Sequence, residues 1–320
     1  MTYVTMDANN TNDLHPKEFI LTGFPGIEDK QRWLSVPFFI IYIVGLAGNT
    51  VTLLIIKTEK SLHEPMYLFI FMLAFVDIVL VISALTKLLA ILWFDAKTIT
   101  FETCIIQMFI VHFFTGFSAS LLVVMAFDRY IAVCNPLRYP NIVTNKFIAI
   151  AVAIAIIRPL GLLLPLPLFA VGFSYCRTNV IDHCYCEMFA LINIACANLE
   201  LSVLYLNWLF IVMTMPDMAL VGLSYCLILS VILKMKTKEA RQKAFSTCSS
   251  HFSVILTFHA LSIVSFVLTN ALPYLRVMAS VLFVVIPAAL NPFIYCLNIK
   301  RIREKIKKVF NSKVILLCDR

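Results

Sequence analysis

The stretch of sequence that decides the fold runs from Met66 to Leu92 and reads MYLFIFMLAFVDIVLVISALTKLLAIL. Its 27 residues contain only two charged side chains, Asp77 and Lys87. A helix that crosses about 30 Å of hydrocarbon needs about 20 mostly apolar residues, because each residue adds about 1.5 Å of rise. The stretch is long enough and apolar enough to do this. It therefore predicts a membrane-spanning helix.

Six further segments of similar length and character lie on either side of this stretch. Only helices and closed barrels satisfy their backbone hydrogen bonds in lipid, and a barrel would show short alternating strands instead of long apolar runs. We therefore predict an all-α membrane protein, a seven-transmembrane helix bundle with a short amphipathic C-terminal helix. The seven predicted spans are 36–57, 66–92, 104–133, 147–171, 200–234, 242–268 and 274–297.

The composition of the whole chain agrees with this class. Of the 320 residues, 61% are hydrophobic and 14% are charged, whereas soluble proteins average about 45–50% and about 25%. The mean hydropathy of +0.91 excludes a soluble enzyme, a disordered chain and a small disulfide scaffold. The low count of eight glycines disfavours glycine-rich phosphate loops and transporters built from glycine-broken helices.

Lysine and arginine set the predicted orientation, because the cytoplasmic loops of membrane proteins are enriched in them. With the N-terminus outside, 18 of the 26 basic residues fall in the cytoplasmic loops and tail, and six fall outside. The predicted organisation is an extracellular N-terminus over 1–35, a seven-helix receptor domain over 36–297, and a cytoplasmic amphipathic helix and tail over 298–320. We expect the basic run at 300–308 to rest on anionic membrane lipid. The net charge of +8 then reflects membrane topology and not binding to nucleic acid.

Half of the ten cysteines lie on the predicted outer side, which is oxidising and favours disulfides. The odd number of outer cysteines leaves at least one without a partner in the set. An alternative is that His183 and Cys186 form half of a zinc site, although a full set of four ligands is not evident. The same side carries the glycosylation sequon Asn9-Asn10-Thr11, which predicts a glycan on Asn9. The five outer cysteines are Cys104, Cys176, Cys184, Cys186 and Cys196.

Several short motifs coincide with the ends of the spans. Residues 125–137 read MAFDRYIAVCNPL, residues 243–251 read KAFSTCSSH and residues 291–295 read NPFIY. In this order and placement they resemble the olfactory receptor family of rhodopsin-like G-protein-coupled receptors. The runs LTGFPG at 21–26 and LHEPMY at 62–67 are similar to its class I, or fish-like, branch.

The resemblance implies an odorant-activated receptor in the plasma membrane, not an enzyme. It implies that the receptor activates a heterotrimeric stimulatory G protein of the olfactory type and so raises cAMP. We expect no cofactor and no metal. The resemblance also implies the disulfides Cys104–Cys186 and Cys176–Cys196, which leaves Cys184 as a free thiol.

Two groups of polar residues carry the mechanism that the resemblance implies. In the coupling group, Asp128 holds Arg129 at rest and Arg129 meets the G protein in the active state; the alternative is an ordinary interfacial ion pair. In the polar core, Asp77 is the hub of a hydrogen-bonded site that sometimes holds sodium; the alternative is a protonated structural residue. The coupling residues are Asp128, Arg129, Tyr130, Tyr225, His251, Asn291, Pro292 and Tyr295, and the polar-core residues are Asn49, Asp77 and Ser118.

Two stripes in the outer half of the bundle predict a ligand pocket. Each follows the spacing i, i+3, i+4, i+7 and so occupies one helical face, and polar groups at this depth should face the bundle. The alternative is hydrogen bonding between helices. The stripes are His112, Thr115, Gly116 and Ala119 on the third span, and Ser262, Ser265, Phe266 and Thr269 on the sixth. The predicted ligand-binding residues are His112, Thr115, Gly116, Leu209, Ser262, Phe266 and Asn270, with Gly116 making room for the ligand.

The charge of this predicted pocket limits its ligand. Relatives that detect carboxylic acids have an arginine at the position of Asn270, and the pocket as predicted holds no permanent cation. A buried carboxylate is costly without a countercharge. We therefore expect a small neutral odorant such as an alcohol, aldehyde, ketone or lactone. Arg158 and Asp217, which lie within spans, have no predicted partner.

Other classes remain as alternatives. A rhodopsin-like receptor for a non-odorant metabolite shares the fold, but an amine receptor would want an acid near His112, which is flanked by Val111 and Phe113. A small-solute transporter or channel would show internal symmetry or charges along a path, and neither is visible. An intramembrane protease would have to be built from Ser118 with His251 or His112, residues that occur commonly by chance.

Overall fold

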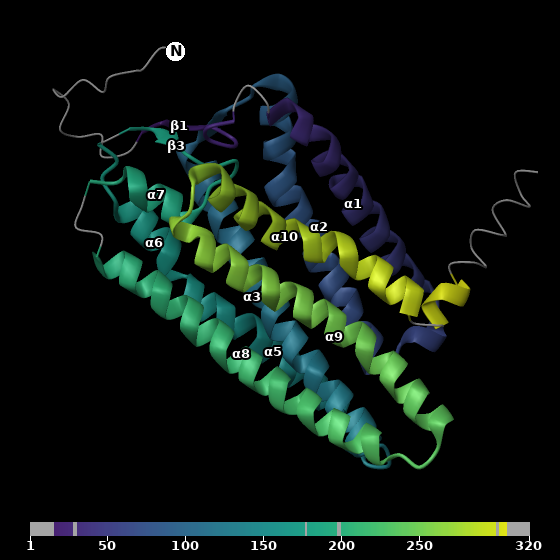
Figure 1. The fold of residues 1–320 in the computed structure, drawn as a ribbon. Helices are drawn as coiled ribbons and strands as arrows, with labels where there is room; N and C mark the ends of the chain where they lie inside the picture. Colours follow the sequence, from purple (N-terminus) through teal and green to yellow (C-terminus); the bar gives the residue numbers. More distant parts are fainter. Residues whose placement is uncertain (1–15, 28–30, 177, 197–199, 299–300, 306–320) are drawn as a thin grey trace, which may run out of the picture.

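The computed structural model describes residues 16–27, 31–176, 178–196, 200–298 and 301–305. In this part of the chain, seven helical segments are long and apolar enough to cross a membrane. They lie side by side in one elongated bundle (Figure 1). The predicted fold class, a helical membrane protein with seven spans, is confirmed.

Six of the spans are single helices whose ends lie within four residues of the predicted ends. The fourth span is divided at Leu164, and a second helix begins at Pro165. Proline has no N–H to continue the hydrogen-bond ladder but suits the first turn of a new helix. The spanning helices are α1 (Ser35–Thr58), α2 (Pro65–Phe94), α3 (Phe101–Cys134), α5 (Asn145–Leu163) with α6 (Pro165–Gly172), α8 (Glu200–Lys234), α9 (Lys238–Val267) and α10 (Pro273–Asn298).

Short helical turns connect the spans. They are η1 (Gln31–Leu34), η2 (Lys60–Leu62), α4 (Tyr139–Ile142), α7 (Met188–Ile194) and η3 (Leu268–Asn270). Two of them bear on function. Helix α4 packs against α3, and α7 covers one end of the bundle next to α6 (Figure 1).

A small three-stranded sheet closes one end of the bundle and was not predicted from the sequence. Its strands are β1 (Glu18–Leu21), β2 (Thr98–Thr100) and β3 (Val180–Ile181), in the order β2-β1-β3. Strand β1 is antiparallel to β2 and parallel to β3. Phe19 and Leu21 of β1 are fully buried beneath it, and the ring of Tyr175 packs edge-on against Phe19. We call this end of the molecule the sheet end.

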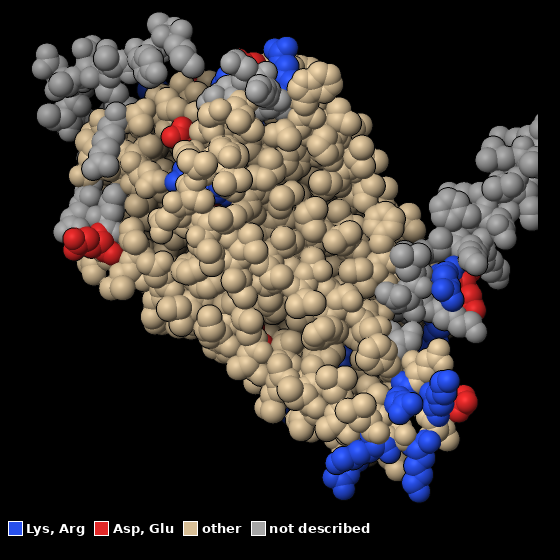
Figure 2. Space-filling model, in the orientation of Figure 1, with Lys and Arg blue, Asp and Glu red and all other residues tan. Residues whose placement is uncertain are grey.

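The opposite end carries a concentration of basic side chains and is called the basic end. Figure 2 shows Lys and Arg gathered where α8 passes into α9, where Lys234, Lys236, Lys238 and Arg241 lie. Between the two ends, the visible face is a broad belt with almost no charged side chain. Such a belt is what contact with lipid hydrocarbon requires.

Close packing between α1 and α10 depends on one glycine of the first span. A Cβ added at Gly48 would lie 2.9 Å from Cβ of Pro292, so a larger residue would push the helices apart. The next residue, Asn49, donates from Nδ2 to the carbonyls of Gly45 and Ala288, both at 2.8 Å. Asn49 thus joins the two helices at the point where the glycine lets them meet.

The described residues after α10, 301–305, are helical and amphipathic. Ile302 is fully buried, whereas Arg301 is exposed and pairs with Glu64 at 2.6 Å. Lys305 pairs with Glu59 at the same distance. The predicted short C-terminal helix is therefore present in its described part. Residues 306–320 and the predicted glycosylation site Asn9 lie outside the described residues.

Candidate functional site

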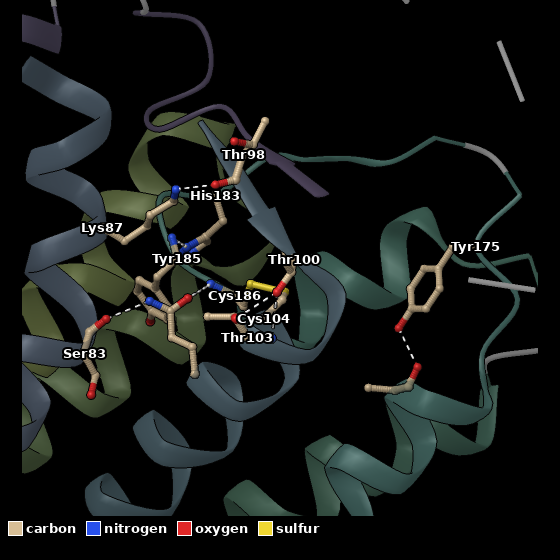
Figure 3. The surroundings of a disulfide bond; sticks show 12 residues. Ser83, Lys87, Thr98, Thr100, Thr103, Cys104, Tyr175, His183, Tyr185 and Cys186 are labelled. Carbon is tan, nitrogen blue, oxygen red and sulfur yellow. Dashed lines mark hydrogen bonds between the residues drawn. A yellow bond between two sulfur atoms is a disulfide. The ribbon is translucent and has the colours of Figure 1, made fainter. Parts of the chain in front are cut away.

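Two disulfides fix the loop between α6 and α8 at the sheet end. Cys104 of α3 is bonded to Cys186, and Cys176 to Cys196, which confirms both implied pairings. Cys184 is a buried free thiol, and burial raises its pKa above the usual range. The alternative of a zinc site through Cys186 is wrong, because that sulfur is in the disulfide (Figure 3).

Hydrogen bonds hold the neighbouring segments against this disulfide. The side chain of Gln107 accepts from the backbone N–H of Cys186 at 3.0 Å and donates to the carbonyl of Ser83 at 2.7 Å. Lys87 of α2 donates from Nζ to the carbonyl of Thr98 at 2.5 Å (Figure 3). It also donates to the carbonyl of Ala96 at 2.8 Å. The loop before β2 and the loop over α3 are therefore both fixed to the helices below them.

A cavity of about 230 Å³ lies beneath this loop, between α3, α8, α9 and α10. It brings together six of the seven predicted ligand-binding residues from three helices. The other members of the two stripes, Ala119, Ser265 and Thr269, line it as well. The six residues are His112, Thr115, Gly116, Leu209, Ser262 and Phe266.

Asn270 is the predicted ligand-binding residue that does not line the cavity. It is exposed and forms the last residue of the short 3₁₀ turn η3. Because α9 ends at Val267 and the turn tightens to about three residues per turn, Asn270 leaves the face that carries Ser262 and Thr269. The structure therefore does not bring Asn270 into this cavity with the other six residues.

The expectation of a cavity without a permanent cation is wrong. Arg276 of α10 lines the cavity, and so does Glu187, which follows the disulfide-bonded Cys186. Glu187 also caps α7 by accepting from the N–H of Ala190 at 3.0 Å, and its other oxygen is 4.0 Å from Nε2 of His112. The sequence could have indicated Glu187, because the expected disulfide between Cys186 and Cys104 of α3 must place this loop over the bundle.

His183 also lines the cavity and is almost fully buried. Its Nδ1 accepts from the N–H of Tyr185 at 3.3 Å, and the Tyr185 hydroxyl is 2.6 Å from that of Ser280 on α10. Burial, reinforced by the positive charge of Arg276, lowers the pKa of His183 to about 3. His183 is therefore a neutral side chain at physiological pH.

Arg158 and Asp217, which had no predicted partner, are partners of each other. Nη1 of Arg158 on α5 lies 2.7 Å from Oδ1 of Asp217 on α8. Nη2 of Arg158 also donates to the carbonyl of Met213 at 2.9 Å. Two charges that would be costly in hydrocarbon thus compensate each other. Asp217 also lines the cavity.

Gly116 serves packing more than it serves free space. A Cβ built on it would lie 2.8 Å from Cε of Met213, 2.9 Å from Cβ of Pro159 and 3.3 Å from Leu163. The glycine therefore lets α3 approach both α5 and α8 beside the cavity wall. Gly116 itself lines the cavity. The space that its missing side chain leaves is occupied by Met213 and Pro159 and not by free volume.

The polar core lies between the cavity and the basic end. Nδ2 of Asn291 donates to Oδ2 of Asp77 at 2.8 Å, whereas Asn49 bonds to the α10 backbone instead. Ser118 joins Asp77 and Asn291 around a space of about 10 Å³, the size of one water molecule. A sodium ion at this position stays a prediction.

The ion pair Asp128–Arg129 is buried near the basic end. Both Nε and Nη2 of Arg129 reach Oδ2 of Asp128, at 3.1 and 2.5 Å. The hydroxyl of Tyr139 on α4 donates to the other oxygen, Oδ1, at 2.7 Å. Burial and the charge of Asp128 raise the pKa of Tyr139 above its usual range, so this hydroxyl keeps its proton.

The remaining coupling residues surround this pair. Tyr225, His251 and Tyr295 are buried, and their side-chain polar atoms have no hydrogen-bond partner within the described parts of the chain. The rings of His251 and Tyr295 lie 5.9 Å apart, and Tyr130 packs against Phe127. The contact between His251 and Tyr295 joins α9 to α10, and the ring of Tyr225 on α8 lies 5.0 Å from that of Phe252 on α9.

Comparisons with known proteins agree with this architecture. A family profile described as olfactory receptor matches residues 38–313. Human olfactory receptor 52K2 is 41% identical over 96% of this chain and 99% of its own length. Mouse olfactory receptor 56B34 is 40% identical over 96% of each. Squid rhodopsin has the same fold, with a TM-score of 0.69 at 16% identity, over 90% of this chain and 87% of its own.

These matches decide between the classes that the sequence left open. Receptors of this family signal through G proteins, sense odorants and are multi-pass proteins of the plasma membrane; they are not enzymes, channels or transporters. The numbered subgroups of the relatives, 52 and 56, fit the class I branch that the motifs indicated. The chain therefore belongs to the olfactory receptor family, in its class I branch.

Proposed function

We propose that this receptor binds a small neutral odorant in the 230 Å³ cavity and then activates a stimulatory G protein of the olfactory type, which raises cAMP. The observation that carries the proposal is the convergence of both sequence stripes on this one cavity, beneath a loop fixed by a disulfide. A cavity of this size fits a volatile molecule and no peptide.

The proposed orientation places the sheet end and the N-terminus outside the cell. Both disulfides lie at the sheet end, and disulfides persist in oxidising compartments. The basic end then faces the cytoplasm, as the enrichment of cytoplasmic loops in Lys and Arg requires. An odorant reaches the cavity from outside, and the G protein meets the end that holds Arg129.

The neutral character of the ligand follows from the compensation of charge around the cavity. Arg276 and Glu187 line it together, and Asp217 is paired with Arg158. His183 adds no charge. A carboxylate would meet Glu187 as well as Arg276, and an ammonium would meet the same two charges, so either would be buried without net compensation, which is costly. Apolar contact supplies most of the affinity, at about 25 cal/mol per Å² of buried surface.

Coupling to the G protein depends on release of Arg129. At rest its guanidinium is held by Asp128, which is itself held by Tyr139. The hydroxyls of Tyr225 and Tyr295, which lack partners among the described residues, are acceptors that Arg129 can reach once it leaves Asp128. A ligand that favours the released state shifts the population toward it.

The experiment is a cAMP reporter assay in cells that express the receptor and the olfactory-type G protein. The panel contains alcohols, aldehydes, ketones, lactones and carboxylic acids of matched chain length. We expect responses to neutral compounds, and Arg129→Ala should abolish them at unchanged surface level. Lys146→Ala, which removes an exposed cation near the same end, serves as the control.

Two outcomes contradict parts of this proposal. Normal signalling by Arg129→Ala at equal surface expression would contradict the assigned coupling role. A wild-type response strongest to carboxylic acids would contradict the neutral ligand. Arg276→Gln would then show whether Arg276 is the cation that binds the acid, because acid responses should disappear in that variant alone.

A further inference from the structure

The part of the cavity nearest the basic end contains three polar groups to which the proposed function assigns no hydrogen bond. We call it the cavity floor, and it consists of Thr115 on α3, Asp217 on α8 and His259 on α9. Asp217 is the lining residue of α8 that lies farthest from the sheet end. Asp217 is 2% exposed and His259 is 6% exposed, so bulk water does not solvate either side chain.

Each member of the cavity floor has a polar atom without a protein partner. These atoms are Oγ1 of Thr115, Oδ2 of Asp217 and both ring nitrogens of His259, judged against all the residues that the structure describes. Buried polar atoms are nearly always hydrogen-bonded, so several unpaired ones around one cavity indicate a polar ligand group or water. The rest of the cavity is lined by both apolar and polar residues, and the apolar ones include Leu209 and Phe266.

The Asp217 carboxylate is held in a fixed orientation by Arg158. Nη1 of Arg158 bonds to Oδ1 at 2.7 Å and lies 3.4 Å from the hydroxyl of Ser120. Nη2 is taken by the carbonyl of Met213 at 2.9 Å. The guanidinium is therefore committed to other groups, and Oδ2 has no hydrogen-bond partner among the described residues.

The three members of the cavity floor differ in what they can recognise. A threonine hydroxyl and a neutral imidazole each donate and accept, so they bind an alcohol and a ketone alike. An ionised carboxylate only accepts. Asp217 is therefore the one member of the cavity floor that distinguishes a ligand O–H from a ligand C=O or ether oxygen.

We propose that Oδ2 of Asp217 is a specificity-determining acceptor that selects odorants with a hydroxyl donor over ketones and ethers of the same shape. This inference rests on the proposed function, since it names the ligand class of the same cavity. The ligand hydroxyl donates to Oδ2, and its alkyl body extends toward Phe266 and Leu209 in the apolar part. Because Arg158 compensates the charge of Asp217, the ligand needs a donor and not a cation.

The first arm of the test uses the wild-type receptor. Straight-chain alkanols of six to nine carbons are compared with the matched methyl ethers, ketones and primary amines in the cAMP assay. A hydrogen bond to a charged acceptor predicts half-maximal concentrations at least about tenfold lower for the alkanols. Equal potency of alkanols and ketones would overturn this inference alone. A preference for the amines would also overturn it, because it would require an uncompensated negative charge.

The second arm reverses the chemistry of the acceptor. In Asp217→Asn, Oδ1 can still accept from Arg158 while the amide N–H₂ takes the place of Oδ2 and donates into the cavity. The ketones should gain potency relative to the alkanols, and the advantage of the alkanols should fall to about threefold or less. Asp217→Asn alone leaves the charge of Arg158 without its carboxylate partner, which could lower surface expression. The double variant Arg158→Gln/Asp217→Asn removes both charges and keeps a hydrogen bond between two amide side chains.

A control and a matched variant separate specificity from folding. Ser224→Ala removes an exposed hydroxyl of α8 that bonds its own helix at Leu220, and it should leave the alkanol-to-ketone ratio unchanged. Thr115→Val should weaken both ligand classes equally. A ratio that does not move in either Asp217 variant, at measurable surface level, would overturn the inference. If the wild-type receptor gave no cAMP response to any neutral odorant, both the proposed function and this inference would be overturned.

Discussion

The two ends of the helix bundle are closed by different kinds of bond. At the sheet end, two disulfides and three paired strands hold the loop over the cavity. At the basic end, the closing contacts are the ion pair Asp128–Arg129, with one supporting hydrogen bond from Tyr139, and the pairs Glu64–Arg301 and Glu59–Lys305.

In the function that we propose, this difference separates the part of the receptor that must keep its shape from the part that must change. A covalent bond persists in every conformation of the folded protein. The loop that Cys186 bonds to α3 therefore stays over the cavity during signalling. Hydrogen bonds and ion pairs can be exchanged for others at small cost. A ligand that contributes only a few kcal/mol can therefore rearrange the basic end but not the sheet end.

The largest effect is expected from the covalent bond at the sheet end. Cys104→Ser or Cys186→Ser should remove most of the receptor from the cell surface, because loss of a native disulfide typically costs about 2–5 kcal/mol. Surface staining of an N-terminal epitope tag measures this. Cys184→Ser, which changes a buried thiol outside the disulfides, should have a mild effect. Equal losses in all three variants would remove the distinction between bonded and free cysteines.

A smaller effect is expected at the buried pair of the basic end. Tyr139→Phe removes the donor to Asp128, a hydrogen bond to a charged group worth about 1.5–3 kcal/mol. The resting state should lose part of its advantage, so cAMP without ligand should rise severalfold at equal surface level.

The control removes a similar hydrogen bond nearer the sheet end. Tyr205→Phe loses a hydroxyl that donates to the carbonyl of Leu162 at 2.7 Å, and it should leave the ligand-independent signal unchanged. If both variants raised this signal alike, the basic end would not be the part that switches.

The smallest effect is expected at the exposed pair of the basic end. Glu64→Gln breaks the contact with Arg301, in which both side chains are more than half exposed. Exposed ion pairs contribute about 0–1 kcal/mol, so the melting temperature of the purified receptor should change little. The double variant Glu64→Gln/Arg301→Gln should match the single one. A large fall in the melting temperature would show that the basic end also depends on contacts that must stay in place.

Local patterns in the sequence were sufficient for the helices and for most of the cavity. The spans follow from apolar length, and the two stripes follow from helical periodicity, which places Thr115 and Ser262 on inward faces. Asn270 was expected in the pocket because it stands beside the second stripe, but the helix has already passed into a 3₁₀ turn at this position. No local pattern marks a change of this kind one turn before a loop.

Contacts between distant segments were beyond the reach of the sequence. Arg158 and Asp217 each looked unexplained because the partner lies 59 residues away on another helix. Arg276 is one of the six basic residues predicted to lie outside, and it lines the cavity from the first turn of α10. The sheet was missed because its strands are two to four residues long and pair across three separate loops.

The sheet has a consequence for how the receptor is made. Its central strand, β1, pairs with β3, and Asn179 beside β3 bonds to Glu18 across 161 residues of chain. At a synthesis rate of about 5–20 residues per second, β1 must wait about 8–30 s for this partner to emerge. During that interval β1 can pair only with β2, which emerges earlier, and in the orientation that we propose its apolar residues Phe19 and Leu21 stay open to a lumenal chaperone. The receptor can then leave quality control only after the fourth span is complete, because β3 follows that span in the chain.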